Sequence, residues 1–140
     1  MKATPPNVEK MTDSYTMPLE PGEAWTRLRS HSFGRLAVSR DGQPEIYPVN
    51  FLANESGILI RTEEGSKVDI IAANFRVAFE VDDASPERAW SVVVKGTARR
   101  MDEAEVVTAQ RAPLWAWAPE PKDVYIRIHP TEVTGRLFAR

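Results

Sequence analysis

The residues best suited to chemistry lie between Arg61 and Lys67, within the segment IRTEEGSK. The pattern predicts a strand that ends near Arg61, a turn at Gly65 and a helix that begins beside Lys67. The first turn of a helix presents amide N–H groups and the positive end of the helix dipole, and both attract a phosphate. A guanidinium and an ammonium add charged hydrogen bonds to phosphate oxygens. We therefore predict a phosphate site formed by Arg61, Thr62, Ser66 and Lys67.

The same spacing also fits a surface without a ligand. In that interpretation an exposed strand, turn and helix carry basic side chains that pair with Glu63 and Glu64. Exposed charges on a protein surface commonly form such weak pairs. The spacing alone leaves both interpretations open.

Two further segments have the residue types of a site for a flat ring. Pro48 interrupts a predicted strand at Tyr47-Pro48-Val49-Asn50. Because proline cannot donate to a strand ladder, neighbouring backbone groups are available to contact a heterocycle; the alternative is an ordinary edge strand. Trp90 begins another predicted strand, where its ring would form an aromatic wall, pack at the rim of the core or lie in a dimer interface.

Other kinds of site find little support in the sequence. There is no cysteine, which excludes disulfides, cysteine-ligated metal sites and thiol catalysis, and which favours an intracellular, cytoplasmic location. His31 and His129 have no metal-ligand spacing, so both are predicted to be structural. The 7 glycines are scattered singly, and the sequence has neither a glycine-rich dinucleotide fingerprint nor a serine nucleophile elbow. No metal and no catalytic side chain is predicted.

Length and charge restrict the function classes further. A chain of 140 residues has the size of one ordinary domain. Its 18 basic and 20 acidic side chains give a net charge of −2, which offers no attraction for nucleic acid. No apolar run reaches the ~20 residues that cross a bilayer, so no membrane span is predicted. We expect residues 1–18 to be a disordered tail, with Met11 as an alternative natural start, and residues 19–140 to form the domain.

The elements that must position these residues are mostly short strands. Asp41 and Gly42 give a hairpin turn between two segments of alternating apolar residues, and similar segments follow. These features indicate a mainly β protein, a closed barrel of six to seven antiparallel strands with a few short helices. Since side chains fill a barrel of this size, a ligand must lie outside it or between two copies. The predicted strands are 33–39, 45–52, 58–62, 74–82, 90–101, 124–128 and 132–138.

Three short helices complete the prediction. Pro21 opens the first, over 21–30. Ser66 and Asp69 have the spacing of a capping box at the start of the second, over 66–73, and Asp102 and Glu105 have it at the start of the third, which extends to about residue 111. The segment 113–122 is predicted to be an irregular, packed loop. The expected buried stripe of the second helix is Val68, Ile71 and Ala72.

Taken together, five segments resemble the pyridoxamine 5′-phosphate oxidase-like family of flavin-binding split barrels. They are GRLAV, PEIYPVN, IRTEEGSK, the strand 90–96 and IRIHPTEVTGR, in the family's order over about residues 19–140. The resemblance implies a homodimer with two FMN sites at the subunit interface, and a flavin-dependent oxidoreductase acting on a small molecule. Carried over by position, the FMN phosphate would be held by Arg61, Thr62, Ser66 and Lys67. The isoalloxazine would be lined by Pro48, Val49 and Asn50, partly through their backbone groups. The other protomer would contribute Trp90 and Ser91, and Trp117 is a candidate to cover the site.

The resemblance leaves several alternatives. The residues that bind pyridoxal phosphate in the true oxidase have no counterpart here, so oxidation of vitamin B6 is not predicted. Related short chains bind the deazaflavin coenzyme, whose longer tail needs an extended basic groove. Arg99, Arg100 and Arg111 are available for such a groove or are surface charges. A non-enzymatic flavin-binding or redox-sensing protein, and a barrel that has lost its ligand, are the remaining alternatives.

Overall fold

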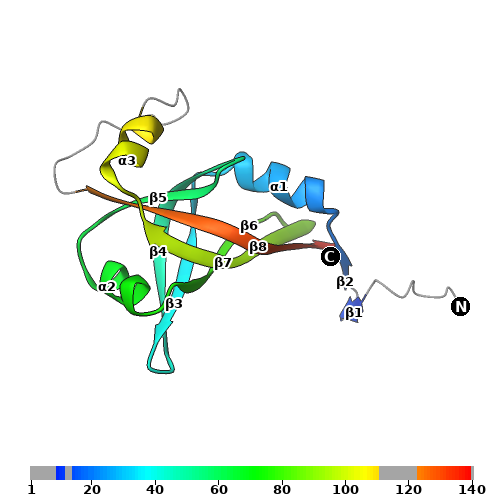
Figure 1. The fold of residues 1–140 in the computed structure, drawn as a ribbon. Coiled ribbons are helices and arrows are strands. Elements are labelled where there is room, and N and C mark those ends of the chain that lie inside the picture. Colours follow the sequence, from blue (N-terminus) through cyan, green and yellow to red (C-terminus); the bar gives the residue numbers. More distant parts are fainter. Residues whose placement is uncertain (1–8, 12–13, 111–122, 140) are drawn as a thin grey trace, which may run out of the picture.

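Antiparallel strands make up most of the computed structural model, which describes residues 9–11, 14–110 and 123–139 (Figure 1). This confirms the predicted mainly β class. The helices are α1 (Pro21–Arg29), α2 (Ser66–Ala73) and α3 (Glu103–Gln110). The strands are β1 (Glu9–Met11), β2 (Ser14–Pro18), β3 (Phe33–Arg40), β4 (Gln43–Asn54), β5 (Gly57–Glu63), β6 (Arg76–Ala84), β7 (Arg88–Arg100) and β8 (Asp123–Ala139).

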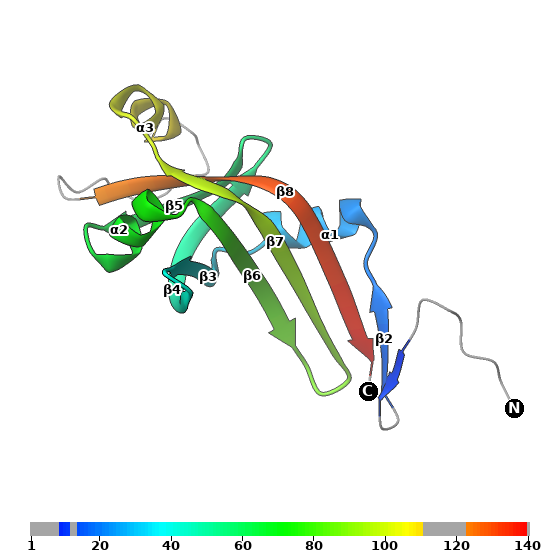
Figure 2. The same cartoon turned by 60° about the horizontal axis from the view of Figure 1, so that its bottom comes forward.

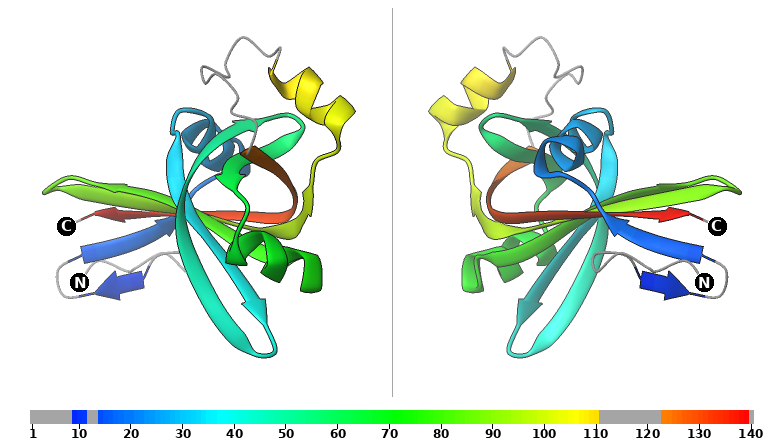
Figure 3. Two further views of the ribbon diagram at one scale, coloured as in Figure 1. Left: turned by 90° about the vertical axis from the view of Figure 1, so that its left-hand side faces the viewer. Right: turned by 90° about the vertical axis from the view of Figure 1, so that its right-hand side faces the viewer.

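The strands close into a barrel because β8 has two neighbours. The sheet order is β1-β2-β8-β5-β4-β3-β6-β7, and β8 also pairs with β7, so the strands from β3 to β8 form a ring. Figure 3 shows this ring nearly end-on, with the β6–β7 hairpin, the end of β8 and β2 extending from it to one side. In Figure 2 the same strands run side by side. The predicted barrel is confirmed.

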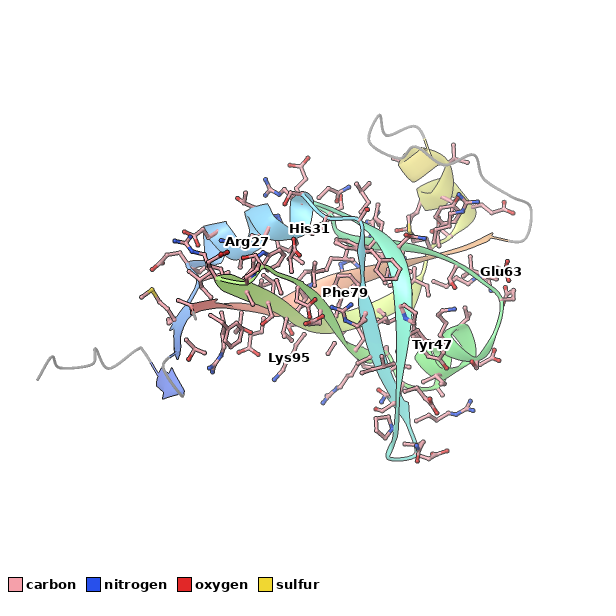
Figure 4. All side chains as sticks on the ribbon, turned by 180° about the vertical axis from the view of Figure 1, so that it is seen from behind. Arg27, His31, Tyr47, Glu63, Phe79 and Lys95 are labelled. Carbon is pink, nitrogen blue, oxygen red and sulfur yellow. The ribbon has the colours of Figure 1, made fainter. Side chains whose placement is uncertain are left out.

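Alternating apolar residues fill the interior of this ring. Leu36, Phe79 and Ile128 are fully buried, and the label of Phe79 in Figure 4 marks the centre of the packing. The rings of Phe51 and Phe79 meet edge to face, with centroids 4.8 Å apart. Because side chains occupy the inside, any ligand site must be sought on the outer surface, as the sequence predicted.

β8 is one continuous strand, although the sequence predicted separate strands over 124–128 and 132–138. The register between β7 and β8 shifts at Lys95 and Gly96, so that Gly96 faces Pro130 and Lys95 faces Glu132. A bulge of this kind absorbs a residue and lets the ladder continue past a proline. Gly96 is required there, since a Cβ would lie 2.2 Å from the carbonyl oxygen of His129.

The helices follow the predicted ranges closely, but their capping differs. Asp102 accepts the amide of Glu105 at 2.8 Å, and the Glu105 carboxylate accepts the amide of Asp102 at 3.2 Å, which confirms the capping box of α3. The capping box predicted for α2 is wrong. Gly65 is its N-cap, Ser66 is already the first helical residue, and no side chain caps the helix. The buried residues of α2 are Val68, Ile70 and Ile71, whereas Ala72 is exposed.

The N-terminal segment is partly a strand. The sequence predicted a disordered tail over 1–18, yet Ser14–Pro18 forms β2 and pairs with β8 from Tyr15 opposite Ala139 to Pro18 opposite Arg136. The long C-terminal half of β8 would otherwise leave an open edge, and pairing satisfies its backbone groups. The rest of the predicted tail, apart from β1, and the predicted loop 113–122 lie outside the described residues. No helix in the described part of the chain is long and apolar enough to cross a membrane.

Candidate functional site

The segment 61–67 lies where the barrel wall splits. β4 and β5 are paired only from Phe51 opposite Ile60 to Asn54 opposite Gly57. Beyond Ile60, β5 continues along β8 while β4 turns away with β3. Helix α2 follows β5 and packs its buried residues into the barrel core. The split therefore brings the start of α2 next to the unpaired side of β4.

Ser66 and Lys67 lie there, and both contact the same third residue. The Ser66 hydroxyl is 3.0 Å from the Tyr47 hydroxyl, and the Lys67 ammonium lies over the Tyr47 ring, 5.2 Å from its centroid. Figure 4 shows Tyr47 beside α2. The amides of the first turn precede the first bond within the helix, from Asp69 to the Gly65 carbonyl. An ammonium, hydroxyls and amides thus gather at one point, which is a donor set that fits a phosphate.

The side chains of Arg61 and Thr62 do not point to one surface, as a shared phosphate site would require. They are consecutive on β5 and face Tyr125 and Val124 of β8, so strand alternation directs them to opposite faces of the wall. Arg61 lies on the outer face with Leu59, and Thr62 on the face of Ile60. The structure therefore joins Ser66 and Lys67 but does not place Arg61 and Thr62 on one surface.

The ion pairs around this segment differ from those expected of a surface without a ligand, in which the basic side chains of the segment pair with Glu63 and Glu64. Glu64 pairs with Arg100 at 2.6 Å rather than with Lys67. Within the described ranges Lys67 has no carboxylate partner, and its ammonium lies over the Tyr47 ring. The Lys67 charge remains available to an anion at the start of α2.

The ring segment is divided by strand alternation. Val49 belongs to the barrel core and is only 5% exposed, so it can line a ring only through its backbone. Pro48 and Asn50 are exposed and point to the outer face. Asn50 directly precedes the first β4–β5 pair and faces Phe33 of β3.

A charged network that the sequence analysis missed lies on the same outer face. Pro48 is opposite Arg35, which is opposite Glu80. The Arg35 guanidinium donates to the Glu80 carboxylate at 2.6 and 2.9 Å and lies 2.7 Å from Asp82. Burial and the hydrogen bond with Asp82 raise the pKa of Glu80, while the hydrogen bond from Glu80 lowers the pKa of Asp82. Arg35, Glu80 and Asp82 alternate with the apolar core residues of their strands, so all three point outward. This alternation was the signal in the sequence that could have revealed the network.

Trp90 is part of the core and not an open aromatic wall. Its ring is 9% exposed, meets His31 edge to face at 4.9 Å and lies 5.0 Å from the guanidinium of Arg27. His31 Nδ1 is 2.8 Å from the Arg27 carbonyl, at the end of α1. Of the interpretations that the sequence left open for Trp90, packing at the rim of the core is the one that this chain shows, and His31 has the predicted structural role.

The register along β8 shows where Arg61 lies relative to Trp90 and Ser91. Arg61 faces Tyr125, whereas Trp90 faces Leu137 and Ser91 faces Arg136. Tyr125 and Leu137 are twelve positions apart on β8, a path of about 40 Å along the strand. Arg61 and the pair Trp90 and Ser91 therefore face opposite ends of β8.

Two arginines considered for an extended basic groove are already paired. Arg99 donates to Glu105 at 2.6 Å, and Arg100 pairs with Glu64. Arg111 and Trp117 lie outside the described residues. Among the described residues there is also no group of histidine, aspartate and glutamate side chains that could hold a metal.

A groove of about 630 Å³ opens on the outer face beyond the charged network. Its floor includes Ala37 and Ala78, which face each other across β3 and β6, and Lys95 of β7. On the outer face this register row follows the row of Pro48, Arg35 and Glu80, with the inward-facing row of Tyr47, Leu36 and Phe79 between them. The groove has the size of a small-molecule site.

Comparison with known proteins gives the family. Residues 20–137 match the family described as Pyridoxamine 5'-phosphate oxidase. An uncharacterized protein of Mycobacterium tuberculosis is 35% identical over 124 residues, which cover 84% of this chain and 82% of that protein.

Two solved structures extend this similarity to the fold. The FAD binding protein from Mycobacterium smegmatis is 39% identical with a TM-score of 0.75, over 89% of this chain and 99% of that one. A FAD-binding protein from Mesorhizobium loti is 27% identical with a TM-score of 0.76, over 87% of this chain and 97% of that one. The split β-barrel described here is therefore a member of the pyridoxamine 5'-phosphate oxidase family.

Proposed function

We propose that this protein binds a flavin nucleotide and acts as a flavin-dependent oxidoreductase on a small molecule. The observation that carries the proposal is the convergence of Ser66 and Lys67 at the start of α2, in a chain whose relatives include two proteins named for FAD binding. The donor set at this point suits the phosphate next to the ribityl chain, which FMN and FAD have in common.

In this proposal each segment has one task. Ser66 and Lys67 hold the phosphate, and only one of Arg61 and Thr62 can add to them from β5, because these two side chains point to opposite faces of the wall. The outer face at Pro48 and Asn50, together with the backbone of Val49, supports the isoalloxazine. A bound flavin would supply the hydride or electron transfer, and the protein would supply orientation and electrostatics. No side chain of this chain is assigned a catalytic proton transfer.

A homodimer belongs to the same proposal, because one chain does not hold all the predicted contacts. Ser91 and Arg61 face opposite ends of β8, so we assign the contribution of Ser91 to a second copy. The side chains of Phe33 and Ile46 support such an interface. They project from the outer face of β3 and β4 and are 53% and 67% exposed. Exposed apolar side chains gathered on one face commonly mark a surface of association.

Two observations favour this proposal over a deazaflavin-dependent reductase and over a flavin-binding protein without enzymatic activity. The pairing of Arg99 and Arg100 with glutamates leaves less positive charge for a deazaflavin tail, which favours FMN or FAD. A flavin-binding protein without enzymatic activity would need no space for a substrate. The groove beside the ring segment offers such space and favours an enzyme. A cytoplasmic location completes the proposal and is tested by cell fractionation.

The experiment is a titration of the flavin-free protein with FMN, FAD, riboflavin and the deazaflavin coenzyme, followed by absorbance and flavin fluorescence. FMN and FAD should bind more tightly than riboflavin, and the deazaflavin should bind weakly. Sedimentation should give twice the 15.7 kDa chain mass. Failure of both nucleotides to bind would overturn the proposed cofactor, and a monomer that binds FMN fully would overturn the shared site.

A further inference from the structure

Tyr47 occupies the split between β4 and the start of α2. It faces Leu36 of β3 in the ladder, and it shares the inward parity of Val49 and Phe51 while remaining half-buried. Its ring packs against the barrel core, and its hydroxyl extends beyond the core to α2. The core therefore fixes the ring, and the ring presents a polar group to the helix start.

Tyr47 contacts both residues that the structure brings together for a phosphate. Its hydroxyl lies 3.0 Å from the Ser66 hydroxyl, and its ring face lies under the Lys67 ammonium at 5.2 Å. Lys67 has a long, flexible side chain, and a cation over an aromatic face loses much of that freedom. Ser66 has a hydroxyl that rotates to suit its neighbours.

We propose that Tyr47 is a positioning residue that orients the Ser66 hydroxyl and the Lys67 ammonium toward the flavin phosphate. This inference rests on the proposed function, because it assigns Tyr47 to the same phosphate site. Tyr47 also directly precedes Pro48, so it links the segment under the ring to the residues that hold the phosphate.

The direction of the hydroxyl pair follows from the chemistry of phosphate. Either hydroxyl can donate in the pair as it stands. A phosphate has only acceptor oxygens when fully ionised, so Ser66 must donate its proton to the ligand. Ser66 must then accept from Tyr47, which makes a chain from the Tyr47 hydroxyl through the Ser66 hydroxyl to the phosphate. Hydrogen bonds in such a chain strengthen one another.

The test compares Tyr47→Phe with the unchanged protein in titrations of FMN and riboflavin. Tyr47→Phe keeps the ring under Lys67 and removes the hydroxyl, so FMN affinity should fall about threefold to tenfold while riboflavin affinity stays within twofold. Tyr47→Leu also removes the ring face and should weaken FMN binding further. Thr26→Ala is the control, since it removes an exposed hydroxyl on α1 that donates to the Gly22 carbonyl at 2.9 Å, and both affinities should be unchanged.

A double-mutant cycle separates positioning from a loss of fold. Ser66→Ala should cost less FMN affinity in the Tyr47→Phe background than in the unchanged protein, because the two hydroxyls act together. Equal losses in both backgrounds would overturn the inference, as would a Tyr47→Phe variant that retains full preference for FMN over riboflavin. If the unchanged protein shows no such preference, the proposed phosphate site itself fails, and this outcome is distinct from a failure of Tyr47 alone.

Discussion

Substitution of Val49 tests the division of the ring segment into an inner and an outer face. Val49→Ala removes two methyl groups from a side chain that is only 5% exposed. At about 0.8 kcal/mol for each group plus a term for the cavity, the loss of stability should be about 1.5–3 kcal/mol. For a domain of this size that corresponds to a fall in Tm of about 5–15 °C.

The assay is thermal unfolding of the flavin-free protein, followed by circular dichroism, beside a flavin titration. Asn50→Ala is the matched control from the neighbouring, outward position. It should change stability by no more than about 0.5 kcal/mol and should weaken flavin binding. Val49→Asp would place an unpaired carboxylate in the core and should prevent folding.

The opposite pattern would refute this account of β4. A Val49→Ala variant with unchanged Tm and weakened flavin binding would show that the Val49 side chain lines the ring. An Asn50→Ala variant that unfolds would show that the inner and outer faces of β4 are reversed.

Three further predictions concern the frame of the site. Gly96→Ala should destabilise the fold by about 3 kcal/mol, because its Cβ would meet the His129 carbonyl, whereas Gly22→Ala has open space on α1 and should be neutral or slightly stabilising in urea unfolding. The hydrogen bond from Arg99 and the amide of Asp102 lower the pKa of Glu105 to about 2, from an ordinary 4.5. The stabilisation by ionised Glu105 is thus fully present above pH 4.5 and lost as the pH falls through about 2, so α3 amide shifts in NMR should titrate there and lose this step in Glu105→Gln. Asp82→Asn removes the hydrogen bond and charge that raise the pKa of Glu80, so carbon NMR of the Glu80 carboxyl should show a lower pKa; an unchanged value would contradict the network.

Features that depend on neighbouring residues could be predicted from the sequence. The Asp41-Gly42 hairpin needs two residues with positive φ, and both have it, at 53° and 76°. The capping box of α3 depends on two side chains three residues apart and was confirmed. The same spacing failed at Ser66 because Gly65 is the N-cap of α2 and Ser66 is already its first helical residue. Local spacing also does not reveal the contact of the Ser66 hydroxyl with the Tyr47 hydroxyl, 19 residues earlier in the chain.

The parts of the site that were missed depend on pairing between distant strands. The sequence grouped Pro48, Val49 and Asn50 as one surface, but alternation on β4 buries the middle residue. Trp90 had the residue type of an aromatic wall, yet α1 returns over it and places His31 against its ring. Pairing of β2 with the end of β8 likewise requires knowledge that β8 continues past Pro130.

The central claim is that the start of α2 recognises the phosphate of a flavin nucleotide. Isothermal titration calorimetry of Lys67→Ala with FMN and riboflavin tests it most directly, with Arg29→Ala on α1 as the control, because this exposed cation also lies over an aromatic ring, 5.8 Å from the centroid of Trp25. A charge-assisted contact is worth about 1.5–3 kcal/mol, so Lys67→Ala should weaken FMN binding by about tenfold to a hundredfold and leave riboflavin binding within twofold. Equal losses for FMN and riboflavin, or no loss for FMN, would contradict the phosphate site.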